Sequence, residues 1–255
     1  MIESTLLKRY HIYGERSSGT NFLDHSIKDN FDAINVFADD VKDVDDIIER
    51  CRKYGHKHWF GDDLDLSDTD DILFLCIVRD PIDWLRSIYR TPRNLYEPMV
   101  ESQERFLFGK YASTAVFYDE KVSFKLGGYE YCNNIFEVRH IKLEWICEKL
   151  PKLVKNYMLI RYEDLKNDFQ GTMKKIKDMG LIKKNDISED IVKMKKWMKR
   201  DDLDDPIATF DFAQKDPKVK LQPTYYRPNY KPFNFSIEDY PREFLHYEKV
   251  LGYLQ

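Results

Sequence analysis

Residues 72–78 form a run of seven consecutive apolar side chains, ILFLCIV, and this run restricts the fold more than any other feature of the chain. Apolar residues at every position suit a strand that has both of its faces buried. Strands of this kind lie in parallel sheets that helices cover on each side. The run therefore predicts the central strand of a parallel sheet flanked by helices.

Strand and helix patterns alternate along the rest of the chain, which favours the α/β class. Further strands are expected at 8–13, 56–60 and 157–160, and helices at 22–31, 81–90, 134–150, 169–180, from 188 onward and from about 241. The segment 91–132 has no sustained periodicity, and long excursions of this kind are often functional, so we interpret it as a candidate lid or acceptor-site segment. Five prolines predict irregular chain over 201–235.

Length and composition suit one domain over residues 1–255, since 42% hydrophobic residues supply a substantial core. A formal charge of −4 argues against broad nucleic-acid binding, which needs a clustered positive surface. The sequence has no basic leader before an apolar run and no stretch of about eighteen uncharged apolar residues, so we expect neither export nor a membrane partner. The cysteines are widely spaced and match no zinc motif, which predicts reduced thiols in a cytoplasmic protein: Cys51, Cys76, Cys132 and Cys147.

The first pattern with a chemical meaning is GERSSGT, Gly14 to Thr20, a glycine-bounded loop between an expected strand and an expected helix. Such a loop directs backbone N–H groups and the positive end of the helix dipole toward one point, where a phosphate or sulfate can bind without a metal. Thr20 stands where a Walker A loop has its Lys, which disfavours a nucleoside triphosphate with magnesium. A tight turn without a ligand is the alternative interpretation.

Residues 14–23, GERSSGTNFL, resemble the 5′-phosphosulfate loop of the sulfotransferase family, which reads Lys or Arg, Ser, Gly, Thr, then Thr or a near equivalent and an aromatic residue. Ser17 stands at the family's cation position, and Arg16, one residue earlier, is its expected replacement. The resemblance implies a P-loop NTPase-like fold, with Phe22 stacking on adenine. It also implies that the phosphosulfate is held by Arg16, Ser17, Ser18, Gly19, Thr20 and Asn21.

A second pattern, Arg79-Asp-Pro81 with Ser87 eight residues after the arginine, begins where the buried strand ends. Open α/β sheets bind ligands at that edge, and an arginine fork with a hydroxyl suits a phosphate monoester. The family's 3′-phosphate motif has the same residues at the same interval, so the resemblance assigns Arg79 and Ser87 to that phosphate. A capped helix with an ion pair between Arg79 and an aspartate is the alternative.

The third pattern is His56-Lys57-His58, between the two anion motifs. In the family a Lys and a His lie at a comparable place, and the His is the catalytic base. The resemblance therefore implies that His58 takes the acceptor proton, with His56 as its rival, and that Lys57 and Arg16 neutralise charge on the leaving oxygen.

Other residues have weaker signals. Tyr162 begins a Tyr-Glu-Asp segment that resembles one in the family whose tyrosine contacts adenine, and a core tyrosine with a hydrogen-bonded hydroxyl is the alternative. The family's late Arg-Lys-Gly loop is absent, and Arg227 and Lys231 are its candidate substitutes. Arg139, on an expected helix near the site, is a candidate support residue.

These patterns predict a sulfotransferase that moves a sulfuryl group from 3′-phosphoadenosine 5′-phosphosulfate (PAPS) to a hydroxyl or amine of a small molecule or glycan, with adenosine 3′,5′-bisphosphate (PAP) as product and no metal. Two alternatives are a small-molecule kinase that uses ATP and magnesium, and a nucleotide-binding module of the same fold without activity. The sequence indicates neither the acceptor nor the oligomeric state.

Overall fold

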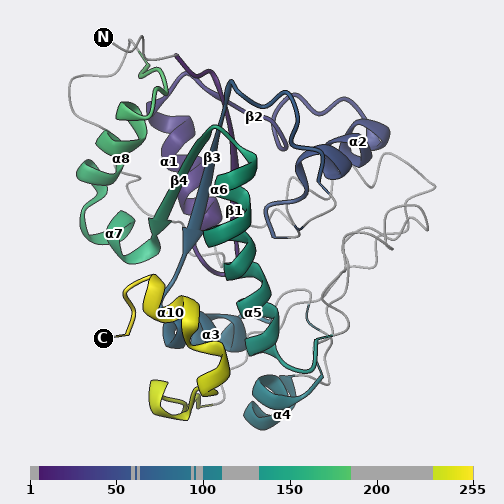
Figure 1. Ribbon diagram of the computed structural model, residues 1–255, viewed down its shortest axis with the longest axis vertical. Helices are drawn as coiled ribbons and strands as arrows, with labels where there is room; N and C mark the ends of the chain where they lie inside the picture. The colour runs from purple at the N-terminus through teal and green to yellow at the C-terminus, as the bar shows by residue number, and fades with distance from the viewer. Residues whose placement is uncertain are drawn as a thin grey trace, which may run out of the picture.

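A computed structural model describes residues 6–58, 61, 64–92, 95, 100–110, 132–184 and 232–254 of the protein. Within these residues one sheet holds four parallel strands in the order β2-β1-β3-β4 (Figure 1). Their bounds are β1 Arg9–Gly14, β2 Ile34–Asn35, β3 Ile72–Val78 and β4 Asn156–Arg161. The predicted α/β class with a parallel central sheet is confirmed.

The central strand β3 is buried along its whole length, as its unbroken apolar run predicts. It pairs in register with β1 on one side and β4 on the other, so that Gly14 lies opposite Ile77, and Arg161 lies opposite Val78. All three strands therefore end at the same edge of the sheet, and the segments that follow them emerge side by side.

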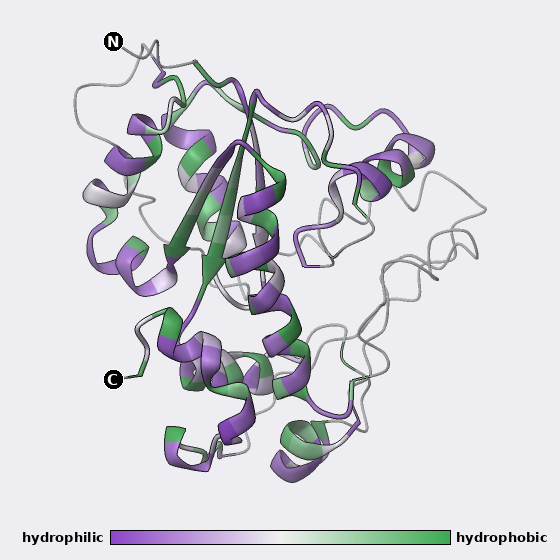
Figure 2. Cartoon of the chain, in the orientation of Figure 1, coloured by the Kyte–Doolittle hydropathy of each residue, from purple (hydrophilic) through white to green (hydrophobic). Residues whose placement is uncertain are grey.

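Helices cover both faces of the sheet (Figure 1). Their bounds are α1 Thr20–Asn30, α2 Val44–Tyr54, α3 Pro81–Arg90, α4 Gln103–Phe108, α5 Ile135–Glu144, α6 Leu150–Leu153, α7 Tyr162–Asn167, α8 Phe169–Asp178 and α10 His246–Val250. One face packs against α1, α7 and α8 through Leu73, Leu75 and Ile77. The central strand β3 is accordingly hydrophobic along its length (Figure 2).

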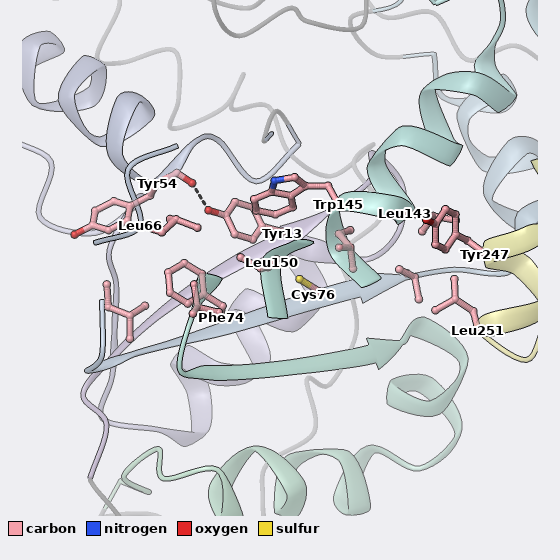
Figure 3. Packing of buried hydrophobic residues seen from close by; sticks show 14 of the residues in the cluster. Tyr13, Tyr54, Leu66, Phe74, Cys76, Leu143, Trp145, Leu150, Tyr247 and Leu251 are labelled. Atoms are coloured by element: carbon pink, nitrogen blue, oxygen red, sulfur yellow. Dashed lines mark hydrogen bonds between the residues drawn. The ribbon is translucent and has the colours of Figure 1, made fainter. Parts of the chain in front are cut away.

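The opposite face packs against α5, α6, α10 and the π-helical turn Trp145–Lys149. Figure 3 shows this cluster, in which the Tyr13 hydroxyl donates a hydrogen bond to the Tyr54 carbonyl. A third cluster joins α3, α4 and the start of α5 to residues 233–245. Helix α3 begins as expected, because the Asp80 carboxylate accepts from the Ile82 and Asp83 N–H groups, and Pro81 takes the first helical position.

Some expectations differ from the structure. Residues 56–58, the described part of the expected strand 56–60, form a bridge and a turn, so that prediction is wrong there. The neighbour of β1 is instead β2, whose two residues are too few to give a periodic signal. Helix α4 lies within the segment 91–132, whose sequence shows no sustained periodicity. Residues 111–131, the helix expected from 188 and most of 201–235 lie outside the described residues.

All four cysteines are described, and each is free, with three of them buried. Among the helices of the described ranges, none has the length and apolar character needed to cross a bilayer.

Candidate functional site

The loop between β1 and α1 is pressed so closely against its neighbours that two of its positions accept only glycine. A Cβ atom on Gly14 would lie 2.7 Å from the Ile77 carbonyl oxygen. A Cβ on Gly19 would lie 2.5 Å from a ring carbon of Tyr162, and Gly19 has a φ of 102°. Both glycines are therefore required, one by close approach and the other by conformation as well.

The same loop presents the start of α1. Gly19 precedes the helix, no described side chain caps its first turn, and that turn contains no acidic residue. Ser17 also has a positive φ of 64°, and the buried Ser18 hydroxyl closes the loop by donating to the Glu15 carbonyl at 2.7 Å. The uncapped N–H groups and the helix dipole can stabilise an anion at this point.

Arg79 joins the end of β3 to this loop. Its Nη1 donates to the Ser17 carbonyl at 3.1 Å, and its guanidinium lies 4.7 Å from the centroid of the Tyr162 ring. A second link comes from α3, where the Trp84 indole N–H donates to the Arg16 carbonyl at 2.8 Å. The two anion motifs predicted from the sequence therefore lie together.

Arg79 also retains capacity for a ligand. Its Nε atom is buried and has no hydrogen-bond partner among the described residues. Among the described residues, Arg79 forms no ion pair with an aspartate, which was the alternative interpretation. The Asp80 carboxylate instead caps α3. Ser87 lies on α3 and is half-buried.

His58 and Lys57 lie against the same loop. His58 Nδ1 is 2.8 Å from the Gly14 carbonyl oxygen, and Lys57 Nζ donates to the Asn21 side chain at 2.5 Å. Burial, followed by the positive charge of Lys57, holds the pKa of His58 well below its usual 6.5, and the pKa of His56 is lowered for the same reasons. Because a carbonyl only accepts, the proton of neutral His58 is on Nδ1 and the lone pair is on Nε2.

Arg16 lies in this group as well, since its charge contributes to lowering the pKa of both histidines. Burial lowers the pKa of Lys57. The structure thus places Lys57 and His58 against the loop with Arg16 near them, whereas their roles in a reaction remain predictions.

Aromatic side chains from α1, α7 and α8 lie beside the loop. The Phe22 ring packs edge-on against Tyr162, with centroids 6.5 Å apart, and stacks near Phe169 at 6.1 Å. Glu163, next to Tyr162, accepts a hydrogen bond from the Asp80 N–H at 3.0 Å and so ties the turn after β4 to the turn after β3. The predicted residue Arg227 lies outside the described residues, as does Lys231.

The sequence did not predict the buried charges beside the loop. Arg139 from α5 has no exposed surface and forms ion pairs with Glu15 and Glu248. Lys142, one helical turn later, is 5% exposed. Burial raises the pKa of Glu15 to about 7, although the positive charge of Arg139 acts to lower it. Burial lowers the pKa of Lys142 to about 8. Only the helical position of Arg139 hinted at a supporting role.

Within the described ranges, no group of three or more His, Cys, Asp or Glu side chains is arranged to hold a metal ion.

Comparison with known proteins identifies a family. The model of the sulfotransferase domain family matches residues 68–201, a little more than half of the chain, and this stretch includes Arg79 and Tyr162 but not the glycine loop. A crystal structure of mouse sulfotransferase SULT7A1 complexed with PAP is similar, with a TM-score of 0.38 and 20% identity. The similarity covers 69% of this chain but only 60% of that one. No curated protein matches the chain.

Proposed function

The chain belongs to the sulfotransferase family, and we propose that it transfers a sulfuryl group from PAPS to a hydroxyl or amine acceptor, with PAP as the product. The observation that carries the proposal is the hydrogen bond from Arg79 to the Ser17 carbonyl, which joins two anion-binding segments at one edge of the sheet. PAPS carries an anionic group at both the 3′ and the 5′ position of its ribose. Two adjacent anion sites suit such a donor better than a single site would.

The loop suits the phosphosulfate end of the donor. The first turn of α1 offers N–H groups that no described side chain caps, and Gly14 and Gly19 allow the loop to pack closely against Ile77 and Tyr162. We assign the 5′-phosphosulfate to residues 16–21, with Thr20 at the first position of the helix.

Arg79 suits the 3′-phosphate. Its buried Nε lacks a partner in the described chain, and a phosphate oxygen would supply one. We assign Ser87, two turns into α3, to the same phosphate. Phe22 and Tyr162 pack against each other beside the loop and offer ring faces for adenine, and Arg227 keeps its assignment as a donor contact on resemblance alone.

In the proposed reaction His58 acts as the base. Its Nδ1–H is used by the Gly14 carbonyl, so Nε2 accepts the proton of the acceptor hydroxyl. The acceptor oxygen forms a bond to sulfur while the bond from sulfur to the bridging oxygen breaks, and that oxygen leaves with the 5′-phosphate. Lys57 and Arg16 neutralise the charge that develops on it, as in phosphoryl transfer, and the scheme uses no metal ion.

A binding comparison tests the donor assignment. Calorimetric titration should show PAP binding at least about tenfold more tightly than adenosine 5′-phosphate, because only PAP engages Arg79. Arg79→Gln should remove most of this difference. Arg86→Gln is the matched control, since Arg86 is an exposed arginine on α3 that pairs with Asp83.

The alternatives give different results. A small-molecule kinase would bind ATP with magnesium as tightly as it binds any nucleotide with a 3′-phosphate. An inactive module would bind PAPS without turnover across a broad panel of hydroxyl and amine acceptors, small molecules and glycans included. Equal affinity of the protein for PAP and adenosine 5′-phosphate would contradict the proposal.

A further inference from the structure

Arg139 is held by two segments of the proposed donor site and by α10. Its Nε donates to Glu248 at 2.6 Å, its Nη2 donates to the same carboxylate at 3.0 Å, and its Nη1 donates to Glu15 in the loop. The same Nη2 donates to the Arg79 carbonyl at 2.8 Å. A single planar group therefore contacts the backbone of the 3′-phosphate motif and a side chain of the 5′ loop.

The indole of Trp84 extends this arrangement. The Arg139 guanidinium lies 4.6 Å from the centroid of the Trp84 ring, and the indole N–H donates to the Arg16 carbonyl. Arg79 in turn donates to the Ser17 carbonyl. The loop therefore contacts the end of β3, helix α3 and Arg139. Arg139 in turn contacts the end of β3 and helix α3.

Stability alone is a weak explanation for such a group. A fully buried ion pair must overcome the loss of hydration of each charge, and well-packed apolar residues often do as well. A guanidinium offers something that apolar residues lack, namely five N–H donors in a rigid plane, which fix the relative position of every acceptor that they contact. In this protein those acceptors belong to two separate anion-binding segments and to α10.

We propose that Arg139 is a positioning residue that fixes the spacing between the glycine loop and Arg79, so that the site distinguishes a ligand with two anionic ends from a ligand with one. The inference rests on the proposed function, because it concerns how the PAPS site is assembled. Once one end of the ligand is bound, the second end meets its partner at a high effective concentration only if the two segments hold their spacing. If the spacing between the two segments loosens, each segment can still bind its own anionic group. The gain in affinity of a ligand that carries both groups then becomes smaller.

The test measures a selectivity ratio, defined as the Kd for adenosine 5′-phosphate divided by the Kd for PAP. Arg139→Lys keeps the charge and removes the planar fork, and we expect it to lower this ratio at least about fivefold while the Kd for adenosine 5′-phosphate changes by less than about twofold. Adenosine 3′-phosphate, which has only the other end, should likewise bind almost unchanged.

Glu248→Gln is the matched control. It weakens the link from Arg139 to α10 but leaves the contacts to Glu15 and to the Arg79 carbonyl. A purely structural role predicts that both variants melt at lower temperature and that both keep the selectivity ratio of the unmodified protein. Our inference predicts a lower ratio in Arg139→Lys and an unchanged ratio in Glu248→Gln.

Trp84→Phe decides the question if Arg139→Lys does not fold. Phenylalanine keeps a ring over the guanidinium and removes the N–H that bonds the Arg16 carbonyl, so the ratio should fall about threefold. An unchanged ratio in every folded variant overturns the inference. A ratio near one in the unmodified protein instead overturns the proposed function, which keeps the two failures distinct.

Discussion

Replacing His11 with phenylalanine should make the folded protein less sensitive to acid. His11 lies in β1 and is 1% exposed, and its ring packs edge-on against Tyr13 with centroids 4.4 Å apart. Neither ring nitrogen has a hydrogen-bond partner among the described residues. Burial lowers the pKa of His11 to about 3, although the charge of Asp24 acts in the opposite direction. Phenylalanine keeps an aromatic ring at this position and cannot take up a proton.

The size of the effect follows from linkage between proton binding and folding. An unfolded histidine binds a proton below about pH 6.5, whereas folded His11 does not until about pH 3, so stability is lost as the pH falls below 6.5. Between about pH 7.5 and pH 5.5 the loss from this residue is about 1.4 kcal/mol. This figure barely depends on the folded pKa, because at pH 5.5 the buried ring is neutral for any pKa below about 4.5.

Urea denaturation at pH 7.5 and 5.5 measures the effect. The unmodified protein should lose about 1.4 kcal/mol more unfolding free energy between the two pH values than His11→Phe does. His25→Asn is the control for the loss of a histidine at an exposed position. The same loss of stability in His11→Phe and in the unmodified protein would show that His11 is not buried as a neutral ring.

Three further predictions concern the site. His58→Ala should lower turnover about a hundredfold and leave PAP affinity within about twofold, whereas the opposite ranking of His58→Ala and His56→Ala would make His56 the base. Turnover should stay level from about pH 8 to pH 6.5, because the pKa of His58 is lowered, and a midpoint near 6.5 in the pH–rate profile would contradict this assignment. Gly19→Ala should weaken PAP binding at least about tenfold, since the new Cβ meets Tyr162, while Gly61→Ala, with no atom of the described residues within 4 Å of its new Cβ, should bind normally.

Much of the fold could be predicted because its signals are local. The apolar run of β3 requires burial on both faces, and Asp80 followed by Pro81 specifies the start of α3 whatever surrounds it. Parallel strands also end at one edge, so the order of the motifs along the chain was enough to predict that the glycine loop and Arg79 come together.

Other features carry no local signal. The two residues of β2 form a strand only because β1 offers an open edge, and residues 56–58 turn because the Gly14 N–H bonds the Lys57 carbonyl. The hydrogen bond that sets the tautomer of His58 joins residues 44 positions apart. Such contacts join residues that are far apart in the sequence, and the local periodicity of the sequence does not predict them.

The buried charges show the same division most clearly. By itself the sequence determined a parallel sheet, the capped helices around it and two anion motifs at its edge. Glu15 and Glu248 lie 124 and 109 positions from Arg139, and each would be read in the sequence as an ordinary solvated charge. Tertiary structure alone placed the three together out of water, because only a partner from a distant segment can compensate the lost hydration of a buried ion.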